Sequence, residues 1–105
     1  MFYLCYSNPP NQKGVFMPSV IIEKLDDAQV KARGIDKWPI WEKEVSRFDW
    51  VYDGVEECYF LEGEVIVETD HGNFTLVAGD FVTFEDGLKC TWDIRKNVRK
   101  HYFFK

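Results

Sequence analysis

The chain has 105 residues, 46% of them hydrophobic and 17% aromatic, and its formal net charge at pH 7 is -5. This length suits one domain with a single core, and the hydrophobic content excludes disorder for most of the chain. The acidic balance argues against a nucleic-acid partner, which needs a basic face. No apolar run reaches the roughly 20 residues of a membrane-spanning helix.

The N-terminal segment, residues 1–19, is expected to be an irregular tail, because Pro9, Pro10 and Gly14 prevent a continuous helix or strand. Its apolar start has no basic residue before it and no arginine, unlike a secretory signal or a transit peptide. The sequence therefore predicts two parts, a tail over residues 1–19 and a folded domain over residues 20–105.

The cysteines are three in number, Cys5, Cys58 and Cys90, and they show no paired spacing. An odd, unpaired set does not fit a disulfide framework. The sequence therefore predicts a cytoplasmic location, or another reducing compartment.

The first regular elements are expected directly after the tail. Residues 20–25 are predicted to form a strand, and Asp26 or Asp27 to cap a short helix that runs to about Ala32. Gly34 then provides the left-handed conformation that commonly ends a helix.

The rest of the chain reads as short strands between turn residues. Gly63 is interpreted as the turn of a hairpin, and Lys96 with Asn97 as the turn before the last strand. Many short strands at regular spacing are typical of a sandwich or a closed barrel. The expected strands cover residues 41–45, 48–52, 57–62, 64–69, 73–77, 81–84, 89–95 and 98–103.

Two stretches resemble the paired motifs of the cupin superfamily. The first motif of that family carries two histidines and a glutamate at fixed distances before a glycine. Counting back from Gly63 places Glu56 at the glutamate position, and Tyr52 and Trp50 at the two histidine positions.

The second cupin motif begins with a glycine and ends with a histidine. Gly79 and Gly87 match its glycines, whereas Glu85 stands in place of the proline and Cys90 in place of the histidine. This stretch therefore keeps the turn residues of the motif and lacks its imidazole.

Residues 37–42 and 98–102 extend the similarity to the small single-domain cupins related to (S)-ureidoglycine aminohydrolase, a manganese enzyme of purine breakdown. The resemblance implies an all-β, cupin-type double-stranded β-helix, or jelly-roll barrel, with a short N-terminal helix. It also implies a homodimer, which would cover the exposed edge strands. The resemblance does not transfer the activity by itself, because fold is not function.

The four positions at which cupins hold a metal are occupied here by Trp50, Tyr52, Glu56 and Cys90. Tryptophan offers no lone pair, and tyrosine is protonated near neutral pH. The remaining carboxylate and thiol are fewer than the three or four ligands of a zinc site, and manganese gains little from sulfur. The sequence therefore predicts no metal and no other cofactor, although the resemblance keeps a divalent ion possible.

Glu56 is the first candidate catalytic residue, because period-two alternation places it on the inner face of the barrel among aromatic residues. A carboxyl that loses hydration there can serve as an acid or base. The alternative is a buried structural carboxyl held by Tyr52, Tyr102 or Lys100.

Cys90 is the second candidate catalytic residue, on the same inner face as Trp92. A nucleophilic thiol requires a nearby cation, and Lys100 is the candidate because the last strand should lie beside that of Cys90. No histidine or asparagine partner is evident, so an inert buried thiol is the alternative. The resemblance places Tyr102 where the aminohydrolases have a substrate-contacting tyrosine.

The sequence thus predicts a metal-free cupin that binds a small polar molecule in an acidic, aromatic pocket. Two alternatives stay open, an enzyme that acts on a ureide-like substrate through Glu56, Cys90 and Tyr102, and a structural subunit of a larger complex. Trp38 and Trp41 are further candidates for the mouth of the pocket. The predicted pocket residues are Trp50, Tyr52, Trp92, Lys100 and Tyr102.

Overall fold

In a computed structural model of the chain, the described residues are 18–105. The predicted tail, with Cys5, lies outside this range except for its last two residues. No helix among the described residues is both long and apolar enough to span a membrane. The elements are β1 (Val20–Lys24), α1 (Asp27–Ala32), a 3₁₀ helix (Ile35–Lys37), β2 (Ile40–Lys43), β3 (Ser46–Val51), β4 (Glu56–Thr69), β5 (Gly72–Val77), β6 (Asp80–Phe84) and β7 (Lys89–Phe104).

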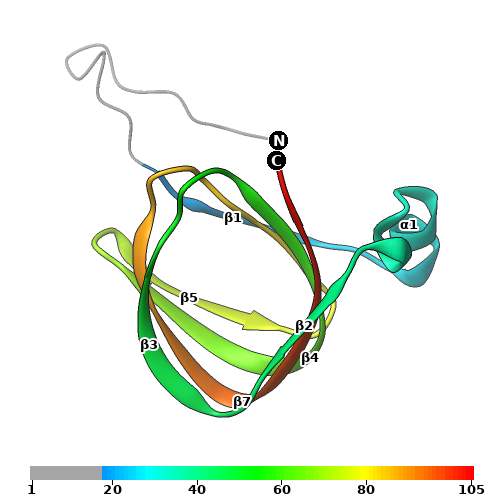
Figure 1. The fold of residues 1–105 in the computed structure, drawn as a ribbon. Helices are drawn as coiled ribbons and strands as arrows, with labels where there is room; N and C mark the ends of the chain where they lie inside the picture. The colour runs from blue at the N-terminus through cyan, green and yellow to red at the C-terminus, as the bar shows by residue number, and fades with distance from the viewer. Residues whose placement is uncertain (1–17) are drawn as a thin grey trace.

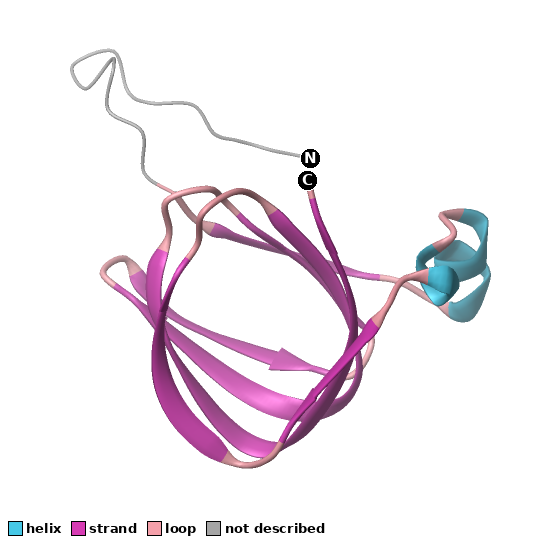
Figure 2. Ribbon diagram, viewed as in Figure 1, coloured by secondary structure: helices cyan, strands magenta, loops and turns pink. Residues whose placement is uncertain are grey.

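The strands form one antiparallel sheet that curls into a jelly-roll barrel, which confirms the predicted fold class (Figure 1). Its main order is β1-β6-β4-β7-β2, while β3 pairs with β7 and β5 with β4. The long strands β4 and β7 therefore run through the whole barrel, and each pairs with several shorter strands. Helix α1 and the 3₁₀ helix lie to one side of the barrel (Figure 2).

Two predicted turns are wrong, because both lie inside continuous strands. Gly63 is in the middle of β4 (Glu56–Thr69), and Lys96 and Asn97 are in the middle of β7 (Lys89–Phe104). Both halves of β4 pair with β7, with register shifts between Phe60 and Val65. The sequence pattern predicts two hairpins, whereas the chain has one pair of long, bent strands.

The bend at Gly63 has a steric cause. Its φ of 114° is strained for any residue with a side chain, and a Cβ there would lie 2.8 Å from the Asn97 carbonyl oxygen and 2.9 Å from Val98 Cα. The irregular register also moves the inward positions of β4 by one residue, from Cys58 and Phe60 before Gly63 to Val65 and Val67 after it. Gly63 thus lets the two long strands cross closely and bend together.

The core has two parts, one inside the barrel and one beneath α1. Asp26 accepts a hydrogen bond from the Gln29 backbone N–H and Gln29 caps Asp26 in return, so α1 has a complete capping box. Gly34, at φ 73°, follows the helix as predicted. The cluster beneath α1 consists of Leu25, Val30, Ile35, Tyr59 and Phe81.

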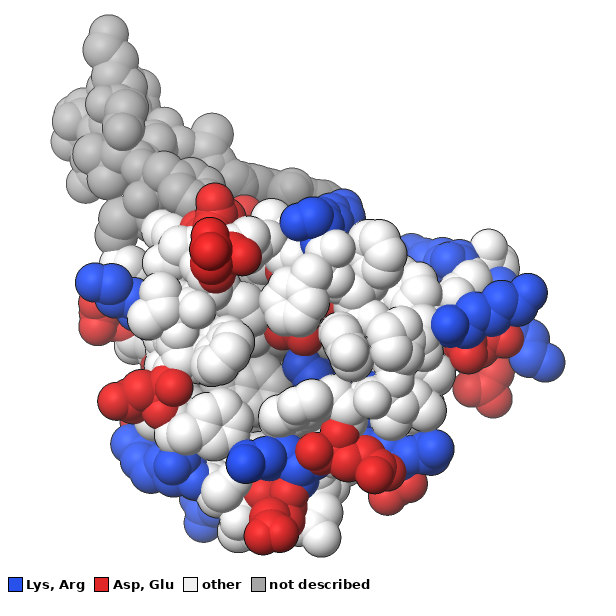
Figure 3. All heavy atoms as spheres, in the orientation of Figure 1, with Lys and Arg blue, Asp and Glu red and all other residues white. Residues whose placement is uncertain are grey.

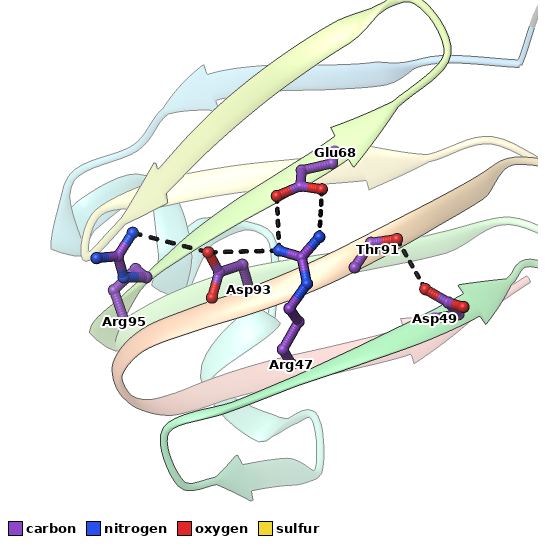
Figure 4. Close-up of polar contacts among 6 residues, drawn as sticks. All are labelled: Arg47, Asp49, Glu68, Thr91, Asp93 and Arg95. Carbon is purple, nitrogen blue, oxygen red and sulfur yellow. Dashed lines mark hydrogen bonds and ion pairs between the residues drawn. The ribbon is translucent and has the colours of Figure 1, made fainter.

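The outer face of the sheet is polar, which fixes the inward direction of the alternating residues. Arg47 on β3 forms two hydrogen bonds of 2.7 and 2.8 Å with Glu68 on β4, and lies 3.6 Å from Asp93 on β7 (Figure 4). Thr91 donates a hydrogen bond of 2.8 Å to Asp49 on the same face. The residues between these, on the opposite face, point into the barrel and line its cavity.

Candidate functional site

The barrel interior opens into a cavity of about 260 Å³. Around this opening the surface is mostly uncharged, and charged side chains gather toward the periphery (Figure 3). Among residues 18–105, its lining contains one acidic residue, Glu56, and one basic residue, Lys100. The other lining residues are all aromatic: Trp41, Phe48, Trp50, Tyr52, Trp92, Tyr102 and Phe104.

Glu56 and Lys100 form an ion pair at the base of this cavity. Glu56 begins β4, and Lys100 lies on the second half of β7, which pairs with that part of β4. Lys100 Nζ donates a hydrogen bond of 2.8 Å to Glu56 Oε2, and each side chain is only 5% exposed. Glu56 is thus a buried carboxylate held by Lys100, and its catalytic role stays a prediction.

Lys100 is further surrounded by two indole rings. Its Nζ lies 5.0 Å from the ring centroid of Trp41 and 4.8 Å from that of Trp92. Cation–π attraction is strongest for tryptophan and increases when the cation is desolvated. The ammonium group is therefore held in place by Glu56 on one side and by two aromatic faces on the others.

Tyr52 is a buried phenol next to the ion pair. Its backbone N–H donates to the Leu88 carbonyl at 2.9 Å, and its ring stacks on Phe84 with a centroid distance of 4.8 Å. Burial, and then the neighbouring Glu56 carboxylate, raise the pKa of Tyr52 far above its usual value. Tyr52 thus stays protonated and uncharged throughout the physiological range.

Cys90 is not among the residues that line this cavity. It packs into the barrel core beside Trp92 and lies opposite Trp50 in the register of β3 and β7. Burial is the main reason that the pKa of Cys90 rises to about 11, although Trp92 opposes the rise. Lys100 pairs with Glu56 instead, so the expected activation of the thiol by Lys100 is not found.

Trp92 and Trp50 differ in how they meet the cavity. Trp92 is 2% exposed, and within residues 18–105 its indole N–H meets only the weakly accepting Cys90 thiol. Trp50 is 48% exposed at the opening, where its ring meets Tyr52 edge-on at 6.3 Å. A ligand entering the cavity would therefore pass Trp50 and reach Trp92 at the interior.

Sequence reasoning missed two walls of the cavity, Phe48 and Phe104. Alternation alone signals both, because Phe48 is two residues before Trp50, and Phe104 two residues after Tyr102. Trp41 lines the cavity as expected, whereas Trp38 instead packs beneath α1 and stacks on Phe103 at 5.2 Å.

The sequence of this chain matches a known protein family. The model of the EutQ-like cupin domain matches residues 30–102. This chain belongs to the EutQ-like cupin family. No match was found among curated proteins.

Solved structures of similar fold include one with half of its aligned residues identical to those of this chain. A DUF861 family protein from Thermotoga maritima is 50% identical, with a TM-score of 0.79 over 83% of this chain and all of that protein. A putative ethanolamine utilization protein Q from Salmonella typhimurium is 22% identical, with a TM-score of 0.55 over 79% of this chain and 66% of that protein. Clostridium difficile EutQ is 18% identical, with a TM-score of 0.56 over 81% of this chain and 66% of that protein. The last two show the fold alone.

The residues of this EutQ-like cupin do not fit a metal at the usual cupin position. Tyr52 stays a phenol, Glu56 is already paired with Lys100, and the Cys90 thiol has a raised pKa. Among residues 18–105 no group of three or more His, Cys, Asp or Glu side chains is arranged to hold an ion. Of the histidines, His71 is exposed in a hairpin, and His101 Nδ1 lies 2.8 Å from the Trp38 carbonyl oxygen.

Proposed function

We propose that this EutQ-like cupin binds a small organic molecule in the barrel cavity without a metal. One observation carries the proposal: a buried ion pair, Glu56 with Lys100, lies beside open space rather than inside packed core. Burying two charges costs several kcal/mol per ion, which their attraction offsets only in good geometry. A protein that used the barrel only as a scaffold would gain stability by filling this space with apolar side chains.

The size and walls of the cavity also support a small ligand. A cavity of about 260 Å³ is slightly smaller than typical ligand pockets, which begin at about 300 Å³, so it suits a molecule with one or two rings. Aromatic walls with few polar groups bind flat molecules by stacking. Of these walls, Trp50 and Phe104 are about half exposed and line the entrance.

A fragment screen tests this proposal directly. Ligands found by thermal stabilisation of the protein are expected to lose their effect in Glu56→Gln, because the variant removes the charged acceptor of the cavity. Glu64→Gln is the matched control, since Glu64 forms only a long surface contact of 3.8 Å with Lys96. If every ligand stabilised Glu56→Gln as well as the wild type, the cavity would not be the binding site.

Elemental analysis tests the metal-free part of the proposal. After exchange of the untagged protein into metal-free buffer, we expect manganese, iron, nickel and zinc well below one per chain. Adding these metals back is expected to give no bound metal, because Glu56 is paired with Lys100 and Tyr52 is protonated. One tightly held ion per chain would contradict this donor count.

An enzyme of the (S)-ureidoglycine aminohydrolase-like type is the second candidate. It is favoured by the presence of Glu56 and Tyr102 in one cavity. The raised pKa of Cys90 and its position outside the cavity argue against a thiol nucleophile. Alkylation of native Cys90 near neutral pH, followed by peptide mass spectrometry, decides this point. A rate above that of a free thiol would restore the enzyme hypothesis.

We further propose that the chain forms a homodimer through β1. Among residues 18–105 this strand pairs with β6 alone, and Ile21 and Ile22 are 50% and 40% exposed. An open strand edge with exposed isoleucines invites pairing with a second copy.

A further inference from the structure

The charges of the cavity restrict what kind of molecule it can hold. We propose that the ligand is uncharged and planar, and that it carries a carbonyl next to an N–H, as in a primary amide or a lactam. Its carbonyl would accept from Lys100, and its N–H would donate to Glu56. This inference rests on the proposed binding function and adds the chemical class of the ligand.

The charged residues that line the cavity balance each other. Among residues 18–105, Glu56 and Lys100 are the only Asp, Glu, Lys or Arg residues in its lining, and they form an ion pair at 2.8 Å. An anionic ligand would find its charge opposed by Glu56, and a cationic ligand by Lys100. Either would also lose hydration among aromatic walls without a free counter-charge, which is costly.

The Lys100 ammonium group has hydrogen-bond donors that the ion pair does not use. An ammonium group has three N–H donors, and Lys100 uses one of them on Glu56. Its other close partners are the rings of Trp41 and Trp92, at 5.0 and 4.8 Å. The indole N–H of Trp92 is directed to the Cys90 thiol and is not counted as a free donor. Lys100 therefore supplies the donors for a ligand oxygen in the cavity.

The ion pair also places a hydrogen-bond donor next to an acceptor. A carboxylate oxygen and an ammonium nitrogen 2.8 Å apart present an acceptor and a donor side by side. An amide presents the complementary pair on neighbouring atoms, so it can bind both without separating the ions. The surrounding rings, among them Trp41 and Tyr102, supply flat apolar walls for the body of such a molecule.

Three probes of nearly equal shape test the inference. Benzamide, benzoate and benzamidine share a benzene ring and a planar three-atom head group, but are neutral, anionic and cationic at pH 7. Their dissociation constants for the full-length wild-type chain are measured by ligand-observed and protein-observed NMR. We expect benzamide to bind at least about tenfold more tightly than either charged probe, because each of these meets one like charge.

Two variants should reverse this preference. In Glu56→Gln, Lys100 is left unpaired, and benzoate is expected to become the tightest of the three probes. In Lys100→Met, Glu56 is left unpaired, and benzamidine is expected to lead. Lys96→Met is the control, since Lys96 is on the surface, outside this cavity, and its change should leave the ranking of the probes unaltered.

The wild-type ranking decides the inference even if a variant fails to fold. Tightest binding of benzoate or benzamidine at the cavity would overturn the neutral ligand class while leaving the binding function in place. If none of the probes, and no fragment of the wider screen, perturbed resonances of cavity residues such as Trp92, the binding function would fail together with its ligand class.

Discussion

The chemistry of this cupin is concentrated in a few residues that the sequence places far apart. Glu56 and Lys100 meet because β4 and β7 are paired, and Trp41 and Trp92 close around the lysine. At two of the other three positions of the usual metal site, Trp50 and Tyr52 add aromatic surface instead of lone pairs. One carboxylate thereby changes from a metal ligand to the acceptor of an ion pair.

Breaking this ion pair on one side should be costly. Glu56→Gln or Lys100→Met is expected to lower the free energy of unfolding by about 3–5 kcal/mol, because each leaves a buried charge without a partner. The double variant should recover much of that loss, since it leaves no unpaired charge. Urea unfolding of the four proteins measures the coupling, with Lys96→Met as the surface control. Losses that simply add in the double variant would contradict a coupled pair.

The buried thiols should make stability depend on alkaline pH. Burial raises the pKa of Cys58 to about 12, from an ordinary value of 9.0. The folded protein therefore keeps the proton of Cys58 at a pH where the unfolded chain releases it. The contribution of Cys58 is complete below pH 9 and should decline from there toward pH 12.

A matched variant isolates this dependence from other groups that titrate in the same range. The difference in free energy of unfolding between wild type and Cys58→Ala should shrink as pH rises above 9, and should be constant between about pH 7 and 8.5. Urea unfolding under reducing conditions measures both proteins. A difference that stayed flat up to about pH 11 would show that Cys58 is not protected by burial.

The long strands β4 and β7 show that a local sequence pattern cannot distinguish a turn between two strands from a bend within one strand. Alternation placed Glu56, Cys90 and Trp92 on the inner face, and all three are buried, with Glu56 and Trp92 in the lining of the cavity. A glycine between two alternating runs, however, looks the same whether the chain reverses or only bends. The difference lies in what approaches the glycine from a distant segment, and local sequence contains no information on that approach.

Gly63 is thus expected to be more sensitive than other glycines of the same backbone class. Gly63→Ala combines a φ of 114° with contacts of 2.8 and 2.9 Å to the backbone of Asn97 and Val98. Gly79→Ala is the control, because Gly79 has a φ of 94° but nothing within 4 Å of an added Cβ. We expect Gly63→Ala to cost at least about 2 kcal/mol more than Gly79→Ala in urea unfolding. Equal costs would mean that the strands can move apart at the bend.

For the molecule as a whole, the sequence predicted the barrel fold better than it predicted the contacts within the cavity. The regular spacing of short strands predicted a sandwich or a closed barrel, and the cupin resemblance, carried in part by the glycines at 63, 79 and 87, implied the jelly roll. The partner of Lys100 depends on register across β4 and β7, so the sequence offered it to both Glu56 and Cys90. Only the folded arrangement, with a distance of 2.8 Å, assigns it to Glu56.

The exposed edge strand β1 leads to a last prediction about assembly. Ile22→Lys places a charge on this edge, where it opposes pairing of strands from two copies. Ile22 is 40% exposed in one chain, so the barrel itself should tolerate the change. Sedimentation equilibrium is expected to give twice the chain mass for the wild type and a single-chain mass for Ile22→Lys. Val45→Lys, at a position 58% exposed and outside β1, should leave the mass unchanged. A wild type that sediments as one chain at high concentration would rule the dimer out, and Ile21 and Ile22 would then be ordinary surface residues.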